Sequence, residues 1–174
     1  GFLLAYSRLS LAYYRKMDYK NALKYSEEAL RIDTYQPESN YAYGLANQKL
    51  KNIPEAKSGF SIASQSIGHR SSSYVELAKL FLNESNYNKA LHYASKAINS
   101  NSNNIVAHMI SAQANRQLNN KASALNNIQN IYKLDPLSDF ARFEDAILNT
   151  DTLGGFNASI TNELPFESYL ELAA

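Results

Sequence analysis

The chain of 174 residues contains no cysteine, so it has no disulfide framework, no thiolate metal site and no cysteine nucleophile. Charge of one sign is also missing, because acidic and basic residues nearly cancel to a formal net charge of +1. A nucleic-acid partner is therefore not expected. No apolar run is long enough to predict a membrane-spanning helix, so no membrane association is expected. These absences leave the compartment undetermined.

The motifs of catalysis and cofactor binding are missing as well. His69, His92 and His108 show no metal-ligand spacing with one another or with a carboxylate. There is no glycine-rich phosphate-binding loop, and the pair Gly154-Gly155 stands in a polar stretch. For His108 a structural role is expected. We therefore expect no enzyme, no cofactor and no metal in this chain, while an active domain elsewhere in a longer parent protein stays open.

What the sequence does contain is a period of thirty-four residues. YKNALKYSEEAL, residues 19–30, is nearly repeated by YNKALHYASKAI, residues 87–98, two periods later. At this period two columns hold only small residues, and these are Ala22, Ala56, Ala90 and Ala124, and Ser10, Gly44, Ala78 and Ala112. Small side chains let two helix backbones approach closely. The period therefore predicts antiparallel helix pairs that cross at these columns.

Each second helix of these pairs has a start signal. Asp or Asn stands just before it in all four units, at Asp18, Asn52, Asn86 and Asn120. Their side-chain oxygens can accept from the unpaired N–H groups of the first helical turn. One residue works against the pattern, because Gly59 is expected to weaken its helix by about 1 kcal/mol relative to Ala.

This helix–turn–helix pattern resembles the tetratricopeptide repeat. Besides the two small columns, the resemblance is carried by Tyr13, Phe81, Tyr19, Tyr87, Phe60 and Pro136. It covers four units, 3–36, 37–70, 71–104 and 105–138, and departs from the family where Asn40 and His108 replace a bulky residue. The resemblance implies an all-α fold, a right-handed α-solenoid of antiparallel helix pairs.

The residues after the fourth unit do not follow the period. Residues 139–149 predict an irregular helix, against which Ile131 is expected to pack, and residues 150–164 are expected to form a loop. Residues 165–174 match the first half of a first helix, which predicts a truncated further repeat. We therefore expect a fragment of a larger protein, with self-association through this end left open. The stretch DPLSDFARFE resembles one in large bacterial repeat proteins that carry a carbohydrate-associated domain.

The resemblance implies a concave groove built from the first helices. Carried over, the groove-facing positions of the family are Leu11, Tyr14, Arg15, Tyr41, Leu45, Lys49, Val75, Lys79, Leu82, Met109, Gln113 and Arg116. This mixture of apolar and basic side chains favours an amphipathic segment with acidic residues as occupant. A tight superhelix would instead bury much of this strip against its own neighbours. The chaperone-binding carboxylate clamp is absent, since Ser7, Leu11, Ala42, Ser72 and Glu76 occupy its positions.

Two functions follow from this architecture. The first is a non-catalytic protein-interaction module that binds a peptide or a partner helix in the groove. The alternative is a structural or regulatory arm that positions another, carbohydrate-associated, domain of a longer parent protein. An exposed apolar groove favours the first function, and a groove filled by the same chain favours the second.

Overall fold

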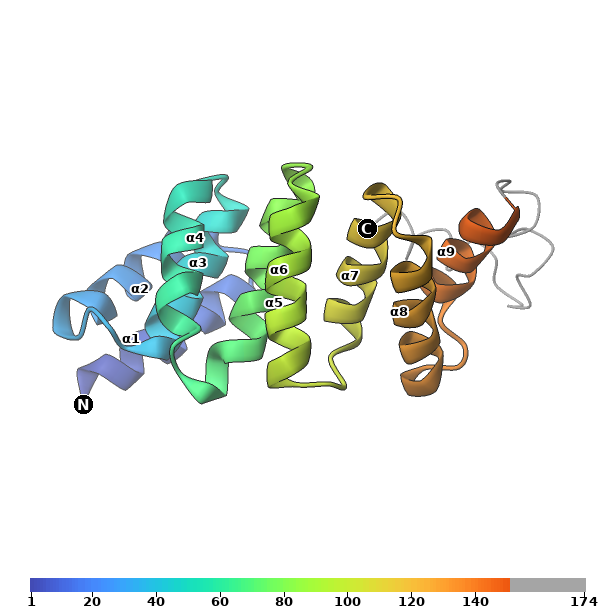
Figure 1. Ribbon diagram of the computed structural model, residues 1–174. Coiled ribbons are helices and arrows are strands. Elements are labelled where there is room, and N and C mark those ends of the chain that lie inside the picture. The colour runs from blue at the N-terminus through green and yellow to red at the C-terminus, as the bar shows by residue number, and fades with distance from the viewer. Residues whose placement is uncertain (151–174) are drawn as a thin grey trace.

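The computed structural model describes residues 1–150, and all regular structure in this range is helical. The helices are α1 (Phe2–Arg15), α2 (Tyr19–Ile32), α3 (Pro37–Lys49), α4 (Ile53–Ala63), α5 (Ile67–Asn83), α6 (Tyr87–Ser100), α7 (Ile105–Gln117), α8 (Lys121–Leu134) and α9 (Asp139–Thr150). Neighbouring helices pack as the pairs α1–α2, α3–α4, α5–α6 and α7–α8, and each second helix also contacts the following first helix (Figure 1). The predicted all-α helical-repeat fold is confirmed.

The residues after the fourth unit are described only in part. α9 spans the stretch expected as an irregular helix and includes one further residue, Thr150. The expected loop, residues 150–164, lies outside the described residues apart from Thr150, and the expected truncated repeat, residues 165–174, lies outside them entirely.

The columns of small residues lie where the paired helices cross. All eight of these residues are buried. In the first pair the two columns are also joined by a hydrogen bond, because Ser10 Oγ donates to the carbonyl of Ala22 at 2.7 Å. Small residues at these positions therefore set the distance between the two helices of each pair.

The second pair crosses most closely at two glycines. A Cβ added at Gly59 would lie 2.7 Å from the carbonyl oxygen of Asn40 and 2.9 Å from the backbone nitrogen of Gly44. A Cβ added at Gly44 would lie 2.7 Å from the ring of Phe60, which is fully buried. The sequence indicated only that Gly59 weakens its helix. In the structure this glycine also makes room for the backbone of α3.

The same period appears in the turns inside the pairs. One residue in each turn has a positive φ, and these are Met17 (61°), Lys51 (67°), Ser85 (56°) and Asn119 (60°), again thirty-four residues apart. In the first turn the N–H of Met17 donates to Tyr14 O at 2.9 Å and that of Asp18 to Tyr13 O at 3.0 Å. This is the Schellman arrangement that satisfies the last carbonyls of a helix, and the other three turns repeat it.

The helix starts after these turns are where the sequence predicted them. Asp18, Asn52, Asn86 and Asn120 all occupy the N-cap position of a second helix. Asp18 and Asn86 accept from the backbone N–H three residues later, at 3.1 and 3.2 Å. The other two side chains make no cap hydrogen bond, and that of Asn52 donates to Asn47 Oδ1 at 3.0 Å instead.

Two further expectations concern the last pair. Ile131 is fully buried in an apolar cluster that includes Ala141 of α9, so it packs against the helix that lies outside the period, as expected. His108 is 5% exposed, with Nδ1 at 3.1 Å from Asn127 Oδ1 and Nε2 at 3.0 Å from the carbonyl of Ser102. Both ring nitrogens therefore have protein partners, which is the structural role expected of this histidine.

Candidate interaction groove

A groove of about 760 Å³ runs along the face formed by the first helices. Seven of the twelve residues predicted from the sequence line it: Tyr14, Leu45, Lys49, Lys79, Leu82, Met109 and Gln113. Its other lining residues are Gln48, Lys51, Glu76, Asn83, Val106, Ile110 and Phe140. All of them come from α1, α3, α5, α7, α9 and the turn after α3, and none comes from a second helix.

The five remaining predicted residues lie elsewhere. Val75 is 5% exposed and belongs to the apolar cluster between α5, α6 and α7, so it has no surface to offer an occupant. Tyr41 packs against Phe60 with ring centroids 5.7 Å apart. Arg116 is engaged with α9, as described below. Leu11 is half-buried and Arg15 exposed, and neither lines the groove. Of the twelve predicted residues, Val75 is therefore buried against its own chain, and seven others line the groove.

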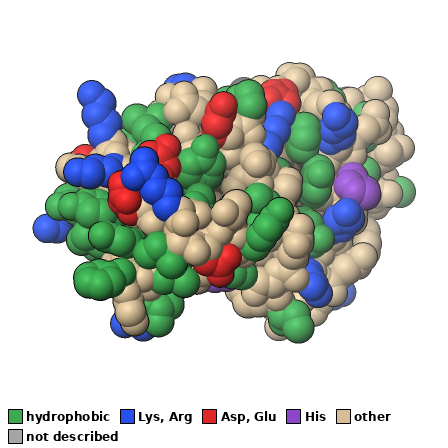
Figure 2. Space-filling model, turned by 90° about the vertical axis from the view of Figure 1, so that its left-hand side faces the viewer, with side chains coloured by type: hydrophobic (Ala, Val, Ile, Leu, Met, Phe, Trp, Pro, Cys, Tyr) green, Lys and Arg blue, Asp and Glu red, His purple; other side chains and the backbone are tan. Residues whose placement is uncertain are grey.

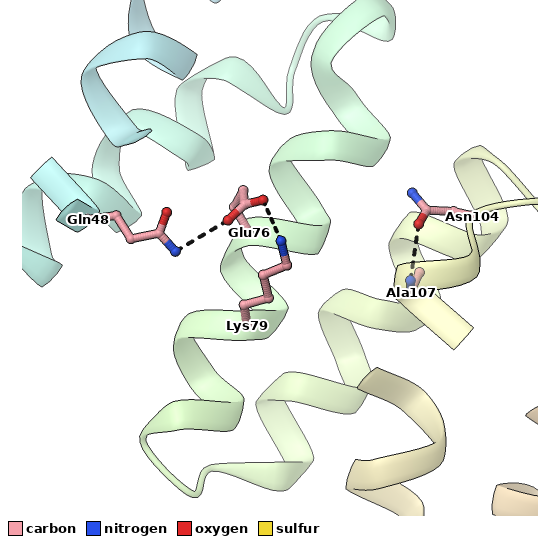
Figure 3. A network of polar contacts seen from close by, with 5 residues as sticks. All are labelled: Gln48, Glu76, Lys79, Asn104 and Ala107. Carbon is pink, nitrogen blue, oxygen red and sulfur yellow. Dashed lines mark hydrogen bonds and ion pairs between the residues drawn. The ribbon is translucent and has the colours of Figure 1, made fainter. Parts of the chain in front are cut away.

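Glu76 of α5 is the acidic residue on the groove wall. Its carboxylate accepts from Lys79 Nζ at 2.9 Å and from Gln48 Nε2 of α3 at 3.3 Å, so it ties the second pair to the third (Figure 3). In the same view Asn104 separately caps α7 by accepting from the N–H of Ala107 at 3.1 Å. Sequence reasoning placed Glu76 only among the residues that rule out a clamp. Gln48 lies in another unit, and Lys79 is three residues away on the same helix, which is a common spacing. No sequence motif therefore indicated a role for Glu76.

Two tyrosines near Glu76 have raised pKa values. Burial, reinforced by the negative charge of Glu76, raises the pKa of Tyr41 to about 12. Burial and then Glu76 also raise the pKa of Tyr14, which lines the groove. Both hydroxyls therefore stay protonated at neutral pH, and Tyr14 offers the groove a hydrogen-bond donor.

The groove keeps a positive balance of charge. Lys79 is paired with Glu76, whereas Lys49 and Lys51 are exposed and form no ion pair within residues 1–150. Apolar side chains lie between these charges, among them Leu82 and Met109. The surface thus offers apolar contact area beside two uncompensated lysines, which suits an occupant with apolar and acidic side chains.

Arg116, predicted for the groove, instead fixes α9. Its Nε lies 2.7 Å from Glu144 Oε2 and its Nη2 lies 3.1 Å from Glu144 Oε1, and the Glu144 side chain is fully buried. The hydrogen bonds to Glu144 raise the pKa of Arg116, against the opposing effect of burial. Because α9 lies outside the period, the sequence pattern held no sign of this partner. The pair holds α9 against α7, where Phe140 extends the groove.

A second exposed surface lies at the N-terminal end of the solenoid. Phe2, Ala5, Leu9 and Ala12 follow one another at spacings of three and four residues, and all four are exposed. Apolar side chains gather on this end of the molecule in Figure 2. One side of α1 is therefore apolar and uncovered within residues 1–150.

Residues 1–150 hold no group of three His, Cys, Asp or Glu side chains arranged to bind a metal ion. In the same range no helix combines the length and the apolar character needed to cross a membrane. The ring of His69 packs on Tyr41 at 5.5 Å and that of His92 on Tyr93 at 5.2 Å.

Comparison with known sequences identifies the repeat. Residues 3–35 and 71–104 match the family model of the Tetratricopeptide repeat. These stretches correspond to the pairs α1–α2 and α5–α6. No curated protein shows a significant match to the chain.

Solved structures extend the likeness to the whole chain. MamA from Desulfovibrio magneticus RS-1 has a TM-score of 0.76 at 16% identity, with 99% of this chain and 94% of that chain covered. For PilF of Pseudomonas aeruginosa the TM-score is 0.76 at 15% identity, covering 98% and 76%. YrrB, described as a tetratricopeptide-repeat protein with an unusual peptide-binding site, gives 0.73 at 16% identity, covering 94% and 90%. At these identities the likeness shows a shared fold.

Proposed function

We propose that the chain, two of whose helix pairs match the tetratricopeptide-repeat model, is a non-catalytic protein-interaction module. Its site is the groove between Tyr14 of α1 and Phe140 of α9. The occupant is a peptide or a partner helix that carries apolar and acidic side chains.

The observation that carries this proposal is the composition of the groove wall. Leu45, Leu82 and Met109 are only partly buried by their own chain, so an occupant would remove further apolar area from water. Removing this apolar area from water favours binding, and it must outweigh the freedom that both partners lose on association. The unpaired Lys49 and Lys51 contribute little affinity as exposed charges, but they select against basic segments and orient acidic ones.

The fold supports the same class of function. Tetratricopeptide repeats generally serve as scaffolds for protein–protein interaction, and a solenoid of helix pairs offers an extended concave surface for this purpose. The peptide-binding site described for YrrB belongs to that protein. Its similar fold makes a peptide ligand a reasonable class for this chain.

The test is selection of peptides from a random displayed library against the full chain. We expect selected peptides to be acidic and amphipathic, and to lose at least about tenfold in affinity when Lys49→Glu and Lys51→Glu are combined with Leu82→Glu. Ile32→Glu is the matched control, because Ile32 is 55% exposed at the end of α2 and does not line the groove. Circular dichroism checks that each variant is folded. Peptides that bind the triple variant as well as the unchanged chain would overturn the proposal.

A further inference from the structure

We propose that the groove is occupied by the chain's own C-terminal segment, residues 163–174, which an external partner must displace. This segment, ELPFESYLELAA, includes residues 165–174, which the period would instead make a truncated further repeat, and we name it the acidic tail. The inference rests on the proposed function, since it names a displaceable occupant of the same groove. An occupant that no partner could displace would instead favour the alternative function, the structural or regulatory arm.

Charge is divided very unevenly along the chain. All 17 basic residues lie within residues 1–150, together with 12 of the 16 acidic ones. The helical part therefore carries a net charge of +5, and residues 151–174 carry −4 with no basic residue at all. The near-neutral total hides two parts of opposite charge that attract each other.

The acidic tail also has the pattern of an amphipathic helix. Glu163, Glu167 and Glu171 recur every four residues, which would place them along one side of a helix. Phe166, Tyr169, Leu170 and Ala173 recur at spacings of three, one and three, which would place them along an adjacent side. Pro165 stands where the first turn of a helix tolerates proline. One sequence therefore offers both an apolar face and a row of carboxylates.

The apolar face of the tail matches the partly exposed apolar side chains of the groove, and its carboxylates match the unpaired lysines. Leu82 and Met109 offer partly buried apolar surface, while Lys49 and Lys51 form no ion pair within residues 1–150. Burial of the aromatic and leucine side chains would supply most of the affinity. The glutamates facing the lysines would set the direction and favour this segment over basic or neutral ones.

The connection is long enough for the tail to reach its own groove. α9 has 12 residues and so spans about 18 Å. Phe140, near its first residue, already lines the groove. Residues 151–162 can extend over about 40 Å, more than the whole length of α9. A tether of this length also gives an effective concentration in the millimolar range, so a contact with a Kd well below about 1 mM would keep the groove occupied.

Distance measurement in the full chain tests this arrangement. The chain has no native cysteine, so two spin labels can be placed cleanly, at Asn83→Cys on the groove wall and Ala174→Cys in the tail. We expect double electron–electron resonance to give a short, narrow distance distribution at low protein concentration. Phe166→Glu with Leu170→Glu should replace it by a long, broad one. The outer face of α1 supplies a control label at Ala12→Cys, for which no short distance to position 174 is expected.

A charge swap distinguishes groove binding from nonspecific collapse. Lys49→Glu with Lys51→Glu should broaden the distribution, and adding Glu163→Lys, Glu167→Lys and Glu171→Lys should restore it. A broad distribution in the unchanged chain, or one that ignores the charge swap, would overturn the proposal. A short distance between two singly labelled copies, whose signal increases with protein concentration, would also overturn the proposal. In that case the tail belongs to a second copy, on the groove or on the apolar face of α1.

Failure here can be told apart from failure of the proposed function. If the tail blocks the groove, Phe166→Glu with Leu170→Glu should raise the affinity for a library-selected peptide by at least about tenfold. Suppose that the Phe166→Glu, Leu170→Glu variant binds the peptide with unchanged affinity, while the triple variant at Lys49, Lys51 and Leu82 still loses binding. The groove is then a binding site, but the tail does not fill it. Binding that is insensitive to both sets of substitutions contradicts both proposals.

Discussion

The second helix pair differs from the other three in how it joins the next unit. At the ends of α2, α6 and α8 an acceptor side chain stands at one column of the period, and its backbone is extended. These residues are Asp33, Asn101 and Asp135, whose Oδ1 atoms accept from the N–H groups of Tyr35, Asn103 and Leu137. The second unit has Ile67 in this column, 85% exposed and without any acceptor.

The helices around Ile67 are rearranged by about one turn. α4 ends at Ala63, and α5 begins at Ile67 itself, whereas α3 and α7 begin four residues after the same column. α4 also contacts α5 less extensively than α2 contacts α3. Arg70 makes a different contact at this junction, because its guanidinium donates to the carbonyls of Ser64 and Gln65 at 3.3 and 3.1 Å. We infer that the period fixes which helices pair, while the acceptor side chain at this column affects where the next helix begins.

The close crossing of the second pair gives the largest expected effect. Gly59→Ala should destabilise the fold by about 1–3 kcal/mol, because its Cβ would meet backbone atoms of α3 that cannot turn aside. Urea unfolding followed by circular dichroism measures the change. Gly68→Ala is the matched control, since nothing lies within 4 Å of an added Cβ there. The free energy of unfolding of this variant should rise by up to about 1 kcal/mol, because Ala has a higher helix propensity than Gly. Equal changes in stability at Gly59 and Gly68 would show that the crossing of α3 and α4 can accommodate a Cβ, which would contradict this prediction.

The contact made by Arg70 gives the next largest effect. Arg70→Ala should cost about 1 kcal/mol, because the carbonyls of Ser64 and Gln65 lose their guanidinium donor. Hydrogen exchange should speed up in the last turn of α4 and not in the last turns of α2 and α6. Arg31→Ala supplies the control, since Arg31 is 74% exposed in an i, i+3 pair with Glu28 and should cost at most about 0.5 kcal/mol. Similar losses for both arginines would contradict the role assigned to Arg70.

The fold was predictable because the packing geometry repeats in the sequence. Helices that cross closely need small residues at their crossing points, and eight such residues recur in two columns. The first-helix face was predictable for the same reason, since the period carries positions such as Leu45 and Met109 to the same wall. Features that recur at the period can be found by aligning the chain with itself.

What occurs once in the chain was not predictable from the period. Arg116 was assigned to the groove because no column indicates that Glu144 lies beside it. Phe140 was not assigned to the groove, since the position of α9 depends on that same ion pair and on Ile131. The left-handed residues of the turns were missed for another reason. Their column holds Met17, Lys51, Ser85 and Asn119, and no glycine marks it.

A smaller effect is expected when the missing acceptor is supplied at the second junction. Ile67→Asp should let the new carboxylate accept from the N–H of His69, which now donates to Ser66 O at 3.2 Å. We expect α5 to begin near residue 71, as α3 begins four residues after Asp33, with a stability change within about 0.5 kcal/mol because the site is exposed. Backbone chemical shifts of residues 67–70 report this change. Ile67→Ala adds no acceptor and should keep the early start, so a helix that begins at residue 67 in both variants would contradict our explanation.

The smallest effect concerns the helix starts, where the first pair has a titratable cap and the second has none. Hydrogen bonds from the Asn21 side chain and backbone N–H lower the pKa of Asp18. A lowered pKa means that this cap contributes fully above the ordinary aspartate range and is lost as the pH falls through the pKa of the folded state. Amide protection in the first turn of α2 should therefore drop in acid, while that of α4 should not, because the Asn52 side chain makes no cap bond. Asp18→Asn keeps an acceptor that does not titrate, so α2 should then lose its pH response. If that variant still responds to acid as the unchanged chain does, the effect comes from elsewhere in the helix and the difference between the two caps is not electrostatic.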